Sequence, residues 1–105
     1  EKIAEKISSD WNYNNNAGLV VGATYPKELS RVREIVGNST ILVPGVGAQG
    51  ADLGSTIKAS GPENVLISSS RAIIYAGQGE FFEDAVRRAA YDTREQIRAH
   101  IENAE

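Results

Sequence analysis

The sequence predicts an α/β fold whose strands form a parallel sheet. Three short aliphatic runs, at 18–22, 41–43 and 64–67, have the composition of strands. They begin 23 residues apart, and the segments between them carry apolar residues at helical spacing. This alternation indicates right-handed β–α–β connections. With 105 residues, the chain has room for one small domain.

The first third of the chain predicts a helix, a polar loop and a strand. Residues 1–9 have an apolar face at helical spacing. The loop over 10–16 is rich in asparagine, and Trp11 and Tyr13 are expected to pack against it. The strand at 18–22 is apolar on both faces, which indicates a position inside a parallel sheet.

The remaining helices are predicted from apolar spacing and from the residues at their ends. One begins at Pro26, which suits a first helical turn, and ends before Gly37. A short helix lies within 52–60, and a short helical segment spans 72–76. The last helix runs from about 80 to 100, with one apolar face.

The second strand ends in a loop rich in proline and glycine. Pro44 lacks an N–H and ends the strand, and the three glycines of residues 45–50, here called the glycine loop, permit positive φ or close approach of a ligand. Their spacing also matches a dinucleotide-binding fingerprint, but no helix begins among them and the required acidic residue about 20 positions later is missing. Gln49 either contacts a ligand or is an ordinary polar loop residue.

Arg71 is the residue that points most directly to a ligand. It directly follows the third strand and is the only basic residue between Lys58 and Arg87. A guanidinium at the carboxyl end of a parallel strand can bind a phosphate through two hydrogen bonds. The alternative is a structural ion pair with a carboxylate. Thr24 and Tyr25 follow the first strand and therefore lie at the same edge of the sheet.

Several other classes of site are disfavoured. The serines at 68, 69 and 70 are interpreted as a polar strand end and not as catalytic nucleophiles. A catalytic serine needs a base beside it, and the only histidine, His100, lies near the far end of the last helix, where it is expected to be solvated. The chain has no cysteine, so disulfides and cysteine metal sites are excluded, and a single histidine excludes a multi-histidine metal site.

Charge and hydropathy disfavour two kinds of partner. The net charge is −3, and basic residues are interspersed with acidic ones, so no basic stripe indicates nucleic acid. No apolar run is long enough to cross a bilayer, and no polybasic run indicates a membrane surface. The lack of cysteine fits a cytoplasmic protein. Since the chain has no methionine and opens in the middle of a helical pattern, we expect a piece of a longer protein.

Three segments resemble orotidine 5'-monophosphate decarboxylase. They are Gly-Leu-Val-Val-Gly-Ala-Thr-Tyr-Pro at 18–26, Leu-Val-Pro-Gly-Val-Gly-Ala-Gln-Gly at 42–50 followed by Asp52, and Ser-Ser-Arg-Ala-Ile-Ile-Tyr-Ala at 69–76. Their order and spacing agree as well, so the resemblance covers essentially the whole chain. It implies a TIM (β/α)8 barrel in which residues 1–105 supply the sixth, seventh and eighth βα units, the C-terminal, phosphate-binding part of one domain.

The resemblance also implies roles for five residues. Gln49 contacts the phosphate and the pyrimidine side of the ligand, and Arg71 binds the phosphate with help from neighbouring backbone N–H groups. Ser70 takes the position that is glycine in many relatives. Pro44 and Val46 match residues that line the pyrimidine end.

The implied reaction removes CO2 from orotidine 5'-monophosphate (OMP) to give UMP, without a metal or an organic cofactor. In the family a Lys-Asp-Lys-Asp array with the signature D-x-K-x-x-D supplies the acid–base chemistry. That signature is missing here, so we expect no catalytic residue in this chain. The implied assembly is a homodimer or an association with the rest of the barrel.

Two alternatives remain at this point. One is a non-catalytic partial barrel that binds a phosphate-bearing ligand. The other is a different TIM-barrel enzyme acting on a sugar phosphate, which the Pro-Gly-Val-Gly-Ala-Gln-Gly segment disfavours.

Overall fold

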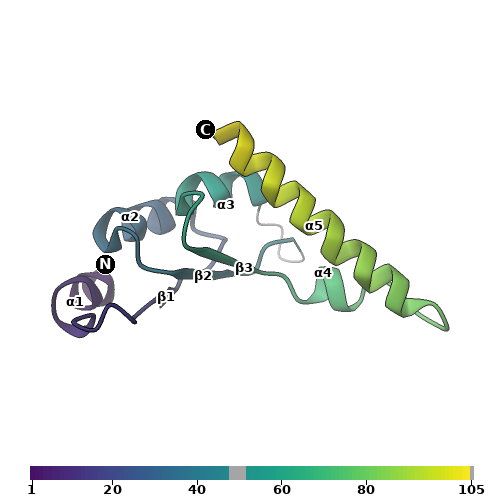
Figure 1. Ribbon diagram of the computed structural model, residues 1–105, viewed down its shortest axis with the longest axis horizontal. Helices are drawn as coiled ribbons and strands as arrows, with labels where there is room; N and C mark the ends of the chain where they lie inside the picture. The colour runs from purple at the N-terminus through teal and green to yellow at the C-terminus, as the bar shows by residue number, and fades with distance from the viewer. Residues whose placement is uncertain (48–51, 105) are drawn as a thin grey trace.

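The computed structural model describes residues 1–47 and 52–104, which form an α/β unit around a parallel sheet (Figure 1). The strands are β1 (Leu19–Val20), β2 (Ile41–Pro44) and β3 (Val65–Ser68). Their order is β1-β2-β3, and both pairings are parallel. The predicted α/β class and the parallel sheet are therefore confirmed.

Helices precede, separate and follow the strands, at nearly the predicted positions. Each α-helix after the first lies within a few residues of the segment predicted from apolar spacing. In chain order the helical elements are α1 (Lys2–Lys6), η1 (Ile7–Trp11), α2 (Pro26–Val36), α3 (Leu53–Ser60), α4 (Arg71–Ile74) and α5 (Phe82–Ala104).

The start of the chain differs from the prediction in two ways. The helix does not end at residue 9, because it continues as the π-helical turn η1, across which Lys6 and Asp10 form an ion pair of 2.7 Å. The expectation that Trp11 and Tyr13 pack the following loop is wrong, since both side chains are exposed. Instead, the Asn12 side chain holds that loop by accepting a hydrogen bond from the Ala17 N–H at 2.8 Å.

The hydrophobic core lies between the sheet and the helices on one of its faces (Figure 1). The fully buried aliphatic side chains of the core are Leu29, Ile41, Val43 and Ile57, which come from α2, β2 and α3. Helix α5 packs against α3 and α4, and its half-buried residues Ile97 and Ile101 extend the core. The helices thus cover the face of the sheet to which Ile41 and Val43 point.

The opposite face of the sheet carries an uncovered apolar row. Val20, Leu42 and Leu66 pair across the three strands, so their side chains share one face. Val20 is 68% exposed and Leu66 is 58% exposed, and no helix of the described residues lies over them (Figure 1). We call these three residues the exposed row.

Strand β1 lies at an edge of the sheet. Within residues 1–47 and 52–104, only β2 pairs with it. The prediction that this strand lies inside the sheet is therefore wrong for this chain.

Arg33 joins the loops at the amino ends of the strands. Its half-buried guanidinium donates hydrogen bonds to backbone carbonyls before β2 and before β3, and within the described residues it has no carboxylate partner. Burial lowers the pKa of Arg33. The acceptors are the carbonyl oxygens of Gly37 (2.7 Å), Ser39 (2.7 Å), Ser60, Glu63 (3.3 Å) and Asn64 (3.2 Å).

Replacing Arg33 by alanine is expected to lower the free energy of unfolding by about 2–4 kcal/mol, because several charge-assisted hydrogen bonds are lost and half-buried carbonyls lose a partner. Lysine should restore little, since a single ammonium cannot reach both loops as the planar guanidinium does. Urea unfolding measures the effect. Arg31→Ala is the matched control, because Arg31 lies on the same helix with an exposed side chain. Equal midpoints for the two alanine variants would refute this role of Arg33.

Candidate functional site

The carboxyl ends of the three strands meet at one edge of the sheet. The Ala23 N–H, just beyond β1, donates to the Pro44 carbonyl at 3.0 Å, and Pro44 pairs with Ser68 at the end of β3. The segments that follow the strands are therefore brought together as the sequence predicts. Pro44 itself is half-buried.

The beginning of the glycine loop packs against the beginning of α4. Gly47 has a φ of 90°, which disfavours other residues. A Cβ at Gly47 would lie 3.4 Å from the Ala72 Cβ and 3.7 Å from the Ser69 Oγ. These are ordinary van der Waals distances, so the positive φ is what favours glycine here, and the loop after β2 lies beside the segment that carries Arg71.

Arg71 and Ser70 lie at the start of α4 with exposed side chains. Ser70 also turns the backbone there, since its carbonyl accepts hydrogen bonds from the N–H groups of Ile73 (3.1 Å) and Ile74 (2.8 Å). In the part of the chain that the structure describes, the Arg71 guanidinium makes no ion pair with any carboxylate. The structural ion pair considered from the sequence therefore finds no partner there.

The other sequence-predicted residues fall in three different environments. Val46 is 5% exposed and belongs to the hydrophobic core. Thr24 and Tyr25 are exposed beyond β1, at the same edge as Arg71. Gln49 lies outside the described residues.

Asp52 caps the helix that follows the glycine loop. Its carboxylate accepts hydrogen bonds from the Ser55 N–H at 2.8 Å and from the Ser55 hydroxyl at 2.5 Å. These two hydrogen bonds, with a smaller contribution from nearby His100, hold the pKa of Asp52 below its usual range. The first turn of α3 is thereby fixed by groups within the chain.

A hollow of about 440 Å³ lies beside these segments. It is bordered by the start of the glycine loop, the start of α4, the first residues of α3 and one side of α5. The residues that line it are Val46, Gly47, Asp52, Leu53, Ser69, Ala72, Ala89, Asp92, Thr93, Gln96 and His100.

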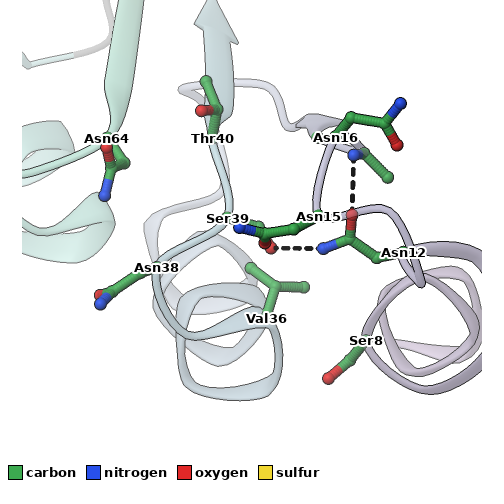
Figure 2. Close-up of a pocket in the computed structure, with 11 residues that line it drawn as sticks. Ser8, Asn12, Asn15, Asn16, Val36, Asn38, Ser39, Thr40 and Asn64 are labelled. Carbon is green, nitrogen blue, oxygen red and sulfur yellow. Dashed lines mark hydrogen bonds between the residues drawn. The ribbon is translucent and has the colours of Figure 1, made fainter.

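A second hollow, of about 580 Å³, lies at the opposite, amino ends of the strands (Figure 2). Its lining is rich in asparagine, and the local backbone accounts for much of that composition. Asn15 and Asn64 have φ values of 55° and 53°, which asparagine tolerates better than most residues. The Asn12 side chain accepts a hydrogen bond from the Ala17 N–H and donates one to the Ser39 hydroxyl, the second of which can be followed in Figure 2. The asparagines of this hollow are therefore explained by the turns they form. The hollow also lies at the opposite end of the strands from Arg71.

The described residues offer neither a metal site nor a membrane span. Within 1–47 and 52–104, no three His, Asp or Glu side chains are grouped so that they could hold a metal ion. No helix in these ranges is both long and apolar enough to cross a bilayer.

Sequence reasoning missed the position of His100. The side chain is exposed, as expected, but it also lies over the first turn of α3, where a Cβ on Gly54 would be 2.9 Å from the His100 Cε1. Gly54 itself was the available signal, because glycine inside a helix often marks a close approach.

The chain is similar to proteins named orotidine 5'-phosphate decarboxylase. The relative from Azoarcus sp. (strain BH72) is 50% identical over 103 residues, which are 95% of this chain and 38% of the relative. The relative from Dechloromonas aromatica (strain RCB) is 49% identical over 100 residues, which are 92% of this chain and 37% of the relative. The chain thus spans well under half the length of these curated relatives. No protein-family model matches it.

Solved structures give the same result. Leishmania donovani UMP synthase superimposes with a TM-score of 0.85 and 38% identity over 95% of this chain and 22% of that chain. Leishmania donovani OMP decarboxylase superimposes with a TM-score of 0.80 and 34% identity, over 95% of this chain and 36% of that chain. The resemblance carried by the three sequence segments is therefore confirmed, and nearly the whole chain is homologous to a part of orotidine 5'-phosphate decarboxylase.

Proposed function

We propose that this chain is the phosphate-binding part of an orotidine 5'-monophosphate decarboxylase, which converts OMP into UMP and CO2. The observation that carries the proposal is the position of Arg71. Its exposed guanidinium follows β3 at the edge where all three strands end, on the segment that Gly47 contacts. The nearly 50% identity to decarboxylases over 95% of the chain supports the same reaction.

In this proposal Arg71 binds the ligand phosphate through two parallel hydrogen bonds. Ser70 presents backbone beside it, and Gln49 contacts the phosphate from the glycine loop. Pro44 lies at the pyrimidine end. Val46 acts there by shaping the loop, because its own side chain is buried in the core.

The proposed fold is a (β/α)8 barrel, of which residues 1–105 form the sixth to eighth βα units. Two features of the sheet support it. The exposed row is apolar, as the interior of a barrel requires, and both β1 and β3 leave an edge that a neighbouring parallel strand can pair. The rest of the barrel, and a second copy in a homodimer, are the proposed protein partners. A cytoplasmic location is part of the same proposal.

The chemical role of this chain is binding and orientation. The proposed reaction places negative charge on a ring carbon, which a positioned ammonium and a proton donor must stabilise. The four lysines of this chain lie on α1, α2 and α3, and none follows a strand directly. Phosphate binding away from the reacting carbon can still lower the barrier, if it fixes the base in its reactive position.

The test is turnover by the intact protein. Purified protein incubated with OMP should form UMP and CO2 in equal amounts, without added metal or cofactor, as measured by chromatography and by release of labelled CO2. A folded protein that binds UMP without converting OMP would instead support the non-catalytic, ligand-binding alternative. A folded protein that neither binds UMP nor converts OMP would refute both.

A further inference from the structure

Gly77 lies where the segment after α4 packs against the first turn of α5. A Cβ built on Gly77 would overlap the Cβ of Ala85, which belongs to that turn. Gly77 does not have a positive φ, so its backbone does not by itself require glycine. The close approach of α5 is therefore the reason for glycine at this position. Figure 1 shows α4 beside the beginning of α5.

Helix α4 has little buried surface of its own to fix its position. It has four residues, and none of their side chains is buried. Between residues 71 and 80, only Ile73 and Gly77 are half-buried. The side chains of Ile74 and Tyr75 are exposed. Within the described residues, the place of α4 therefore depends on its packing against α5, in which Gly77 is the closest point of approach to Ala85.

Backbone hydrogen bonds connect Arg71 to this contact without a break. They span residues 70 to 76, and Gly77 is the next residue. Because the hydrogen-bonded turn moves as one unit, a shift of Gly77 away from α5 also shifts the backbone that carries the Arg71 guanidinium. The bonds join the Ser70 carbonyl to the Ile74 N–H (2.8 Å), the Arg71 carbonyl to the Tyr75 N–H (3.1 Å) and the Ile73 carbonyl to the Ala76 N–H (3.2 Å).

We infer that the contact between Gly77 and Ala85 positions Arg71 for the ligand phosphate. The contact holds α4 at one place on α5, and so determines where the guanidinium lies relative to the strand ends. Hydrogen bonds to a phosphate weaken steeply when their donors are displaced. The inference rests on the proposed function and names the packing on which its phosphate site depends. Gly77 and Ala85 are positioning residues, and neither touches the ligand.

The test compares Gly77→Ala, Ala85→Gly and the double variant in the intact protein. In Gly77→Ala the Kd of UMP should rise about tenfold, because the new methyl meets a Cβ that has no rotamer to relieve the overlap. The Kd of uridine, which lacks the phosphate, should change little. In the double variant the UMP affinity should return. The nearest atoms then left to the added methyl are the Cα and the carbonyl oxygen of Phe82, at 3.4 and 3.5 Å, which are ordinary van der Waals distances.

Two further variants are the controls. Ala85→Gly alone should bind UMP nearly as the wild type does, because it relieves the contact without pushing α4 away. Ala90→Gly introduces the same helix-destabilising residue at an exposed position of α5 and should also match the wild type. Circular dichroism and thermal melts confirm folding. If Gly77→Ala does not fold, Ala85→Val, which enlarges the other side of the contact, takes its place.

A second cycle tests whether the effect passes through Arg71. In an Arg71→Ala background, Gly77→Ala should have little further effect on UMP binding, because the group that it displaces is already missing. A further loss as large as the one in the wild-type background would show that the effect reaches the ligand by another route, and would overturn the inference.

The outcomes separate this inference from the proposed function. A wild-type protein that neither binds UMP nor converts OMP would refute the function, and this inference with it. With a wild type that binds UMP, unchanged UMP affinity in Gly77→Ala would overturn the positioning role alone. Equal losses for UMP and uridine would also overturn it, because they would indicate a general structural effect.

Discussion

A polypeptide of residues 1–105 alone will show no measurable decarboxylation of OMP. The segments after its three strands offer Thr24, Arg71 and the glycine loop, which can bind a ligand but cannot stabilise and protonate a carbanion. Its lysines lie on helices, at positions 2, 6, 27 and 58. Removing a complete set of catalytic groups costs roughly a millionfold or more in rate, which leaves only binding.

The assay must exclude the host's own decarboxylase, so the chain should be produced in cells that lack that gene. The positive control is a mixture with the complementary part of the full-length protein, in which activity should return if the two parts assemble. Reproducible turnover by the pure 105-residue chain would show that the chemistry resides in residues assigned here to binding alone.

Arg71→Ala in the intact protein is expected to weaken UMP binding by about 3 kcal/mol or more, which is at least a hundredfold. The guanidinium is exposed beside the Gly47 contact and has no carboxylate partner within the described residues, so its hydrogen bonds are available to a ligand. Isothermal titration calorimetry with UMP measures the loss.

Two controls define what Arg71 binds. Uridine should bind Arg71→Ala and wild type nearly equally, because it carries no phosphate. Arg87→Ala removes an exposed arginine of α5 that does not line the hollow beside the start of α4, and it should leave UMP binding unchanged. If uridine loses as much affinity as UMP, the phosphate assignment fails.

Local sequence signals predicted most of the fold. The aliphatic runs located the strands, and Pro26 and Gly37 marked helix ends, because these residues act on the backbone of their immediate neighbours. The place of β1 at the edge of the sheet was not predictable in this way. An apolar strand reads the same whether or not a second strand pairs with its outer side.

The candidate site was predictable where it depends on strand ends and not where it depends on distant packing. Pro44 and Arg71 follow aliphatic runs, so parallel pairing alone brings their segments together. The contact between His100 and Gly54 joins residues far apart in sequence, and no periodicity reveals it. The structural role of Arg33 could not be predicted either, because its partners are backbone carbonyls, which every residue has.

The hydrogen bonds from Arg33 to backbone carbonyls bear on how the chain can change during evolution. Arg33 binds main-chain oxygens in both loops, so its hydrogen bonds do not depend on which side chains those loops carry. Substitutions at exposed positions such as Asn38 or Glu63 therefore leave the Arg33 hydrogen bonds intact, provided the backbone keeps its path. The amino ends of the strands can accumulate sequence differences around one fixed arginine, while the carboxyl ends are constrained residue by residue by the ligand they are proposed to bind.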